Sequence, residues 1–425
     1  MASTMVYKPT VSGLARPWHS IRFAPTRAQS HKCMHGLQRR VSSRTGEKGV
    51  IIHTHARGVQ QGRRVVVQAT SSGVEATTSR SLVPRRVEKV EKFARLPVWP
   101  VVPGVIFIIL DLLRLNELAA FLEHRFGGRV CPMMFTPEQT DPFVLCVHHR
   151  HSFWWWDPVR PIFRLLLPEG FPAHPHRGFE TVTYMLSGGF RHRDSTGVQQ
   201  YYGEGCVQWM TAGRGILHEE MWESDIDTHE LYQIWVNLPA KDKMCAPRIQ
   251  MLGEDTDAEG KLGAIPEHAE GGVRVKVVSG EFEGVRSPVA THSPVTLLHV
   301  TVQSGATFKM ELPAGDTCML YCRKGAAVVG GQEVPTFATA FLERSGEVLV
   351  VQNEKQAELD FMLLSGTPLR EPIQSQGSMV MNNSMEIEMA YRDYQMGKFG
   401  FPWDHSLTNE EWLQHVEKHR PSMMK

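Results

Sequence analysis

From about residue 171 onward, the chain alternates short apolar runs with glycine-containing turns. Apolar segments such as TVTYML, CVQWMTA and LYQIWVNL are separated by SGG, TGVQQYYGEG and GRG. Short strands separated by turns at this density are typical of a sandwich or barrel of antiparallel strands. A second series begins near Val273 and includes PVTLLHVTV, TCMLYC and LDFMLLSG. The pattern therefore predicts an all-β fold with two β-barrels in tandem.

Two further segments complete this outline. The polar stretch 252–272 separates the two series and is predicted to be a linker or surface loop. One clear helix is predicted in NNSMEIEMAYRDYQMG, where Asn383 can cap the first turn with Glu386 three residues on. Ile387 and Ala390 lie on one face of that helix. We expect the helix to pack on a barrel rather than form a domain.

Composition changes the picture at the N-terminus. The first acidic residue is Glu47, and the residues before it are rich in Arg, Ser, Thr and small side chains. This composition is typical of import into mitochondria or plastids, and RRVVVQATSSG looks like a plastid processing site after Ala69. We predict a disordered transit peptide over 1–69 and a chloroplast location. A mitochondrial location is the alternative, as is the cytoplasm or nucleus if the segment is an ordinary basic tail.

Several function classes fit the sequence poorly. The formal net charge is +1, which gives no electrostatic footprint for nucleic acid or an anionic membrane. The apolar stretch 101–115 is interrupted by proline, glycine and charged residues before it reaches the roughly 20 residues that a bilayer requires. We predict no membrane partner and treat 70–128 as a linker or poorly defined segment. Seven widely spread cysteines without a CxxC pair fit neither a disulfide scaffold nor a zinc ribbon.

Candidate chemistry lies in two short motifs. HPHRGFETVTYM contains His174 and His176, and residues two apart on a strand project to the same side. The same spacing in GRGILHEEM places His218 and Glu220 on one face and Glu219 on the other. If the two segments pair, three imidazoles and one carboxylate converge, which suits a divalent transition metal because a buried glutamate must be paired or bound to a cation. The alternative is a set of surface histidines on an edge strand.

These motifs carry a resemblance to a known family. FPAHPHRGFETVTYMLSGGFRHRDSTG, VQWMTAGRGILHEEM and LYQIWVNLPAKDKM are similar to the motifs of the pirins, a branch of the cupin superfamily with two β-barrels. The resemblance runs from about Thr136 to about Gly400. It implies an N-terminal cupin barrel with a metal site over 129–250, a C-terminal cupin barrel without one over 271–372, and a tail with a helix over 373–425.

The resemblance also implies the metal ligands. They are the two histidines of the first motif, with the histidine and second glutamate of the other: His174, His176, His218 and Glu220. Many other cupins use the glutamate of the first motif, so Glu180 is expected here to support the site or the fold instead. Three imidazoles and a carboxylate leave open positions that suit Fe(2+), with manganese, nickel, copper or zinc as alternative occupants. Iron is the metal that the family implies.

Two functions follow from the resemblance. Pirins that act on flavonols imply a quercetin 2,3-dioxygenase-type oxidoreductase, in which O2 opens the ring, carbon monoxide leaves and Glu220 takes the hydroxyl proton. Pirins that act as regulators imply an iron-dependent, redox-sensitive protein that binds a protein partner, as a transcription cofactor does. A relic that has lost its metal is a third alternative. The implied partner is a small aromatic molecule such as a flavonol, or a protein, and we expect a monomer.

Parts of the chain depart from the family pattern. Cys206 stands where the family usually has aspartate, so one polar contact is expected to be missing. Residues 147–170 bring a run of histidines, tryptophans and leucines in place of a polar loop, which we interpret as a surface loop or an error in the coding sequence. The family's first strands are hard to find in 97–129, so the first barrel is expected to be incompletely closed. The second barrel offers only His292 and His299, and we predict no metal there.

Overall fold

The computed structural model describes residues 82–94, 96–97, 109–110, 112–115, 118, 129–152, 160–164, 168–223 and 225–420. The predicted transit peptide over 1–69 lies outside these residues. By its internal contacts the chain divides into Met1–Ala76 and Thr77–Lys425, and all the described residues belong to the second unit. Within them, no helix is both long enough and apolar enough to cross a bilayer.

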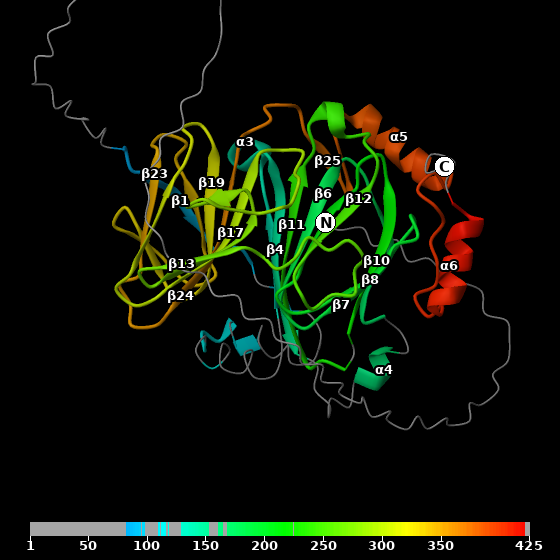
Figure 1. Cartoon of the computed structure of the whole chain (residues 1–425), viewed down its shortest axis with the longest axis horizontal. Helices are drawn as coiled ribbons and strands as arrows, with labels where there is room; N and C mark the ends of the chain where they lie inside the picture. The colour runs from blue at the N-terminus through cyan, green and yellow to red at the C-terminus, as the bar shows by residue number, and fades with distance from the viewer. Residues whose placement is uncertain are drawn as a thin grey trace, which may run out of the picture. The chain divides into compact units, whose positions relative to one another are not determined.

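The first barrel consists of a seven-stranded sheet and a four-stranded sheet, both antiparallel (Figure 1). The larger sheet has the order β12-β9-β6-β11-β4-β3-β2, with bounds Arg248–Leu252, Val207–Thr211, Phe179–Ser187, Thr228–Asn237, Phe143–Ser152, Arg129–Met134 and Leu96–Pro97. The smaller sheet has the order β5-β10-β7-β8, with bounds Gly170–His176, Ile216–Trp222, Phe190–Asp194 and Gln199–Tyr202.

The second barrel repeats this plan. Its larger sheet has the order β1-β22-β19-β24-β17-β14-β13, with bounds Val87–Glu91, Thr339–Leu342, Thr317–Lys324, Leu359–Gly366, Val295–Val302, Val273–Ser279 and Glu267–Glu270. Its smaller sheet has the order β18-β23-β20-β21, with bounds Thr307–Glu311, Val348–Gln352, Ala327–Val329 and Gln332–Val334. A separate pair joins β15, Glu281–Phe282, to β16, Val285–Arg286. The predicted all-β fold of two tandem barrels is confirmed.

One strand comes from a segment that we predicted to be a linker. β1 pairs antiparallel with β22, so a strand from upstream of the first barrel completes the sheet of the second (Figure 1). Val87 and Val90 pack against the core of the second barrel, which explains why this short segment is held there. The predicted range 271–372 therefore omits β1 and β13, both of which belong to the second barrel.

The interpretation of 147–170 as a surface loop is wrong for its first residues. β4 lies between β11 and β3 in the larger sheet, so its backbone is paired on both sides. Its three histidines, His148, His149 and His151, are buried. His149 and His151 are joined by a 2.8 Å contact between Nε2 and Nδ1. The neighbouring strands decide this outcome, because β11 and β3 pair with both edges of β4.

The two seven-stranded sheets pack face to face and bury an apolar layer between the barrels. The first barrel contributes side chains such as Val182 and Ile234, and the second contributes Leu297 and Met362. Because successive strand residues point to opposite faces, the even-numbered residues of β6 near Val182 face this layer. The odd-numbered residues face the interior of the first barrel.

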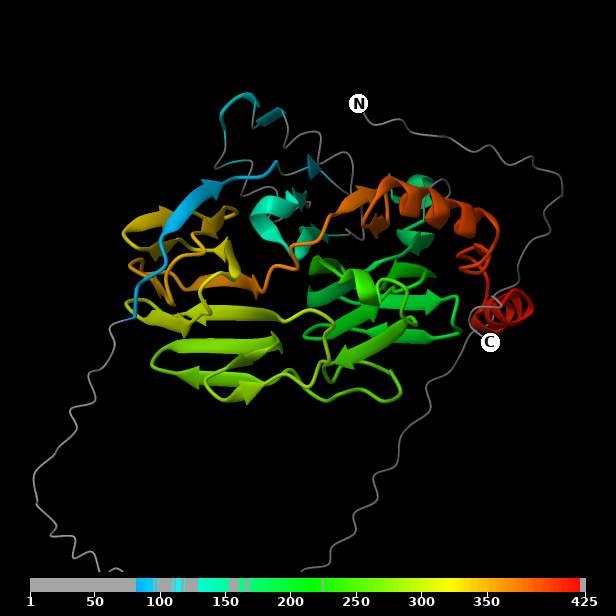
Figure 2. The same ribbon diagram turned by 90° about the horizontal axis from the view of Figure 1, so that it is seen from above.

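The C-terminal tail returns to the first barrel (Figures 1 and 2). The predicted helix is confirmed as α5, Ser384–Gln395, whose N-cap Asn383 accepts a hydrogen bond from the Glu386 amide at 3.0 Å. A second helix, α6, Asn409–Lys418, was not predicted; it begins with a capping box formed by Thr408 and Glu411. The remaining short elements are α3 (Pro137–Thr140), α4 (Arg160–Arg164), η1 (Ala240–Asp242), β25 (Gln374–Gln376) and β26 (Met379–Met381).

The two C-terminal helices support the histidine-bearing strands from outside. Leu217 of β10 belongs to one apolar cluster with Ile387 and Ala390 of α5, Phe399, and Trp412 of α6. Leu217 directly precedes His218. The tail therefore backs the strand whose inner face carries the second candidate motif.

Candidate metal centre

The two motifs meet as neighbouring strands of the smaller sheet in the first barrel. β10 pairs antiparallel with β5, which places His218 opposite His174 and Ile216 opposite His176. The register shifts between His218 and Glu220, so Glu220 lies opposite Phe171. The predicted pairing of the two segments is confirmed.

The three histidines converge. Each can offer one ring nitrogen such that the three atoms lie within 4.8 Å of one another. Their ring centroids are 4.4 Å apart for His174 and His218, 4.7 Å for His174 and His176, and 4.8 Å for His176 and His218. β5 is an edge strand of its sheet, but His176 and His218 are buried, so the alternative of surface histidines is wrong for these two.

The protonation of these rings suits a metal. The Nδ1 of His174 donates to the Pro172 carbonyl at 2.8 Å, which leaves Nε2 with its lone pair free. Burial lowers the pKa of all three rings, and the neighbouring imidazoles lower the pKa of His176 and His218 further. The three rings are therefore neutral at physiological pH, which is the form that binds metals.

Orphaned nitrogens give an independent test of this fit. Within the described part of the chain, no hydrogen-bond partner meets Nδ1 or Nε2 of His218, or Nδ1 of His176. Buried polar atoms are normally paired, because burying them unpaired costs free energy. A cation bound by these imidazoles would satisfy the lone pairs. The residues present therefore fit the metal that the fold implies.

Glu220 is held close to the histidines but is not one of the converging group. Its Oε1 accepts hydrogen bonds from Thr183 Oγ1 at 3.1 Å and Tyr202 OH at 2.7 Å. Its Oε2 accepts from Gln233 Nε2 at 3.1 Å. Burial is the largest influence on the pKa of His174 and lowers it, whereas the negative charge of Glu220 raises it. Glu220 as a metal ligand and as the catalytic residue stays a prediction.

Sequence reasoning missed a second buried pair at the site. β7 is the other neighbour of β10, and it places His192 opposite Glu220 and Asp194 opposite His218. His192 Nε2 lies 3.1 Å from Asp194 Oδ2, and the His192 ring centroid is 5.4 Å from that of His218. Both side chains are fully buried. The period-two spacing in FRHRD could have indicated that they share a face.

Glu180 lies away from the histidines. The turn between β5 and β6 changes the alternation of faces, and Glu180 occupies the face of β6 opposite to Thr183. Its Oε1 accepts a 2.6 Å hydrogen bond from Thr211, and burial raises its pKa. It is a buried structural carboxyl beside the layer between the barrels.

The substitution at Cys206 does not leave the turn without a polar contact. Its Sγ donates to the Asp255 carbonyl at 3.1 Å, so a thiol contact replaces the polar contact that was expected to be missing.

His292 and His299 of the second barrel lie apart from the candidate metal centre. His299 Nδ1 lies 2.9 Å from Tyr184 OH, and His292 Nε2 lies 3.8 Å from Cys245 Sγ.

Two tandem antiparallel barrels, with converging histidines inside the first, define a two-domain cupin protein. Residues 129–236 match the Pirin family profile, and 297–400 match the Pirin C-terminal cupin domain. A pirin-like protein of Solanum lycopersicum is 41% identical over 242 residues, which are 56% of this chain and 80% of that protein. Pirin of Homo sapiens is 41% identical over 239 residues, 55% of this chain and 79% of its own. The chain belongs to the pirin family.

A solved structure adds a likeness at the level of the fold. A quercetin 2,3-dioxygenase from Acinetobacter baumannii is 32% identical and superposes with a TM-score of 0.56, covering 64% of this chain and 92% of that one. The coverage includes nearly all of that enzyme, so both barrels of the present chain have counterparts in it.

Proposed function

We propose that this pirin is a metal-dependent dioxygenase of the quercetin 2,3-dioxygenase type, which opens the ring of a flavonol-like substrate with O2. The observation that carries the proposal is the convergence of three histidines, offering one ring nitrogen each within 4.8 Å. The likeness to the Acinetobacter baumannii quercetin 2,3-dioxygenase supports the substrate class.

The residues that would hold the ion are His174, His176 and His218, with Glu220 as the fourth ligand. Imidazoles with a carboxylate and open positions suit Fe(2+), which we propose as the metal. When bound, iron supplies a Lewis acid for the substrate oxygen and a redox centre for O2. Burial keeps the three rings neutral, so they do not need to lose a proton before binding.

Glu220 is the group that we propose to accept the substrate's hydroxyl proton. Its carboxylate is tied by three neutral donors, so its orientation is set before a substrate arrives. Phe179 and Trp235 lie beside the histidines: their ring centroids are 4.5 Å apart, and that of Trp235 is 5.5 Å from His176. Such an aromatic pair would stack against a flat aromatic substrate and exclude water from it.

The test is turnover by the full chain loaded anaerobically with Fe(2+). We expect O2 uptake and carbon monoxide release with quercetin, and neither with a flavone that lacks the 3-hydroxyl. His218→Ala should reduce turnover to background, while His268→Ala, on β13 of the second barrel, should retain it. Equal turnover rates for the two variants would rule out the proposed dioxygenase activity at this site. Iron binding without turnover of any flavonol would favour the redox-sensitive regulator instead.

We also propose a plastid location for this pirin, on the composition of residues 1–69. A fluorescent protein fused after residue 76 should enter chloroplasts of a plant cell, and a fusion that lacks residues 1–69 should stay in the cytoplasm. Entry into mitochondria would contradict the proposal.

A further inference from the structure

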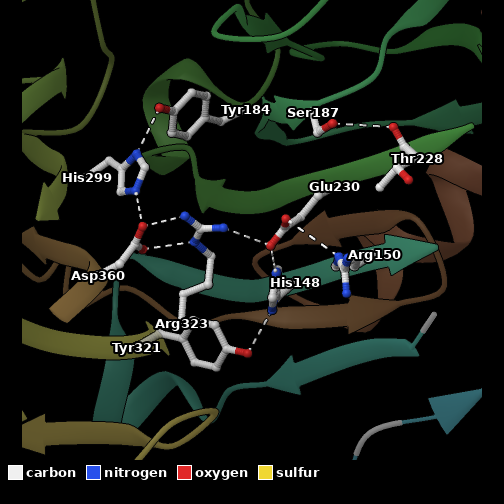
Figure 3. A network of polar contacts seen from close by, with 10 residues as sticks. All are labelled: His148, Arg150, Tyr184, Ser187, Thr228, Glu230, His299, Tyr321, Arg323 and Asp360. Carbon is white, nitrogen blue, oxygen red and sulfur yellow. Dashed lines mark hydrogen bonds and ion pairs between the residues drawn. The ribbon is translucent and has the colours of Figure 1, made fainter. Parts of the chain in front are cut away.

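A buried polar network joins the two barrels where their large sheets face each other (Figure 3). Three contacts of this network cross the junction: Tyr184 OH to His299 Nδ1 at 2.9 Å, His148 Nδ1 to Tyr321 OH at 2.9 Å, and Arg323 to Glu230 Oε1 at 3.0 Å. The first barrel supplies one partner of each contact from β6, β4 or β11. The second barrel supplies the other from β17 or β19.

The charged members of this network fix its geometry. Arg323 donates to both oxygens of Asp360 as well as to Glu230. The side chains of Arg323, Asp360 and Glu230 are 10%, 3% and 13% exposed. Buried charges cost several kcal/mol unless they are paired with good geometry. The network therefore resists any relative movement of the strands that carry it.

Two of these three strands of the first barrel, β6 and β11, hold Glu220 from their other face. Thr183 of β6 and Gln233 of β11 are cross-strand partners, and each donates to Glu220. Thr183 binds Oε1 and Gln233 binds Oε2, so the carboxylate spans the two strands. The next cross-strand pair, Tyr184 and Tyr232, points to the opposite face and meets the second barrel.

We propose that Tyr184 and Tyr321 are positioning residues for the metal centre: through them the second barrel fixes β6 and β11 and thereby sets the orientation of the Glu220 carboxylate. A shift of one strand past the other would pull Thr183 and Gln233 apart and rotate the carboxylate between them. This gives the second barrel a role at the site of the first, and it rests on the proposed function of Glu220 at that site.

The test uses Tyr184→Phe, which removes one hydroxyl and keeps the ring. Tyr391→Phe is the matched control, because the Tyr391 hydroxyl on α5 donates one 2.9 Å hydrogen bond to the Gln376 carbonyl of β25, away from the junction. In the metal-free full chain, the NMR resonances of the Gln233 side-chain amide should move in Tyr184→Phe and stay in Tyr391→Phe. Tyr321→Phe is the second variant, should Tyr184→Phe fail to fold.

Cobalt(II) titration gives the second readout. Tyr184→Phe should weaken Co2+ binding about threefold, less than the 10- to 100-fold typical when a direct partner of a ligand is lost. The same change in a Glu220→Gln background should leave Co2+ affinity unaltered, because its effect acts through the carboxylate. An unmoved Gln233 amide, or equal losses of affinity in both backgrounds, would overturn the proposal. If the unmodified chain bound no Co2+, the proposed metal site would be ruled out. The Gln233 amide resonances would still test whether Tyr184 positions the Glu220 carboxylate.

Discussion

His174 and His218 are direct cross-strand partners in the antiparallel pair of β5 and β10, with ring centroids 4.4 Å apart. Strand register holds the two imidazoles side by side, so His218→Ala removes one of the three converging ring nitrogens. We predict that His218→Ala weakens Fe2+ or Co2+ binding by more than the 10- to 100-fold typical of losing a ligand's hydrogen-bond partner. Calorimetric titration of the full chain measures this, with His268→Ala as the control.

Thermal unfolding checks the same site by another route. A metal that binds only the folded chain stabilises it by about 2.7 kcal/mol at a free concentration of 100 times Kd. The melting temperature of the unmodified chain should therefore rise with added metal, and that of His218→Ala should stay constant. An equal rise in both would place the bound metal elsewhere.

Arg177 anchors the end of the strand that carries His174 and His176. Its Nε donates to the Arg214 carbonyl at 2.6 Å, and its NH1 donates to Asp393 of α5 at 3.0 Å. We predict that Arg177→Met costs about 2 kcal/mol of unfolding free energy, because both hydrogen bonds are lost. The cost is not larger because Asp393 keeps its 2.6 Å contact with Lys398 and is not left unpaired.

Urea unfolding measures this cost, and the metal affinity of the same variant should also fall. Arg191→Met is the matched control, because the Arg191 side chain is 61% exposed in its pair with Glu223. Such surface pairs contribute less than about 1 kcal/mol. If the two arginine variants were equally stable, the C-terminal tail would not support the site.

The sequence predicts the site well where local spacing decides it. The period-two pattern places His174 and His176 on one face of a strand, and His218 and Glu220 on one face of another. Pairing of these two strands then brings the histidines together. Local spacing fails where the chain turns between strands. Glu180 follows the turn after β5, and its face depends on how many residues that turn contains.

Burial and long-range contacts are beyond such patterns. β4 contains HHRH and looks exposed, yet it is central because β11 and β3 pair with it on both sides. The donors to Glu220 come from three strands that are distant in sequence: Thr183 on β6, Tyr202 on β8 and Gln233 on β11. No single motif contains them, so only the assembled barrel reveals the set.

Glu230 makes the junction between the barrels sensitive to acid. Burial alone would raise its pKa, but the hydrogen bond and charge of His148 and the charge of Arg323 lower it from 4.5 to about 2. A lowered carboxyl pKa stabilises the fold above the unfolded value, and the contribution is lost as pH falls from about 4.5 toward 2. By linkage it amounts to about 3 kcal/mol at pH 7.

Glu230→Gln should therefore be destabilised most at pH 7 and progressively less toward pH 3, relative to the unmodified chain. Urea unfolding at pH 7, 5, 4 and 3 provides the comparison. A difference in stability that does not change over this range would show that the carboxylate charge is not what holds the junction.

Glu180 and Glu220, two of the buried glutamates of the first barrel, should respond in opposite ways to the same substitution. Burial raises the pKa of Glu180, so its folded form favours the proton and its contribution to stability is lost as pH rises through the raised pKa. Glu180→Gln keeps an acceptor for Thr211 and removes the charge, so it should be at least as stable as the unmodified chain at pH 8, with unchanged metal affinity.

Glu220→Gln should instead lose metal affinity, because an amide replaces the proposed ligand. One of its three donors would also meet an NH2 group, which cannot accept a hydrogen bond. Co2+ titration and urea unfolding of both variants at pH 6 and pH 8 separate the two roles. An equal loss of Co2+ affinity in Glu180→Gln would mean that the face of β6 toward the second barrel contributes to the metal centre, and would contradict the assignment of the site to the barrel interior.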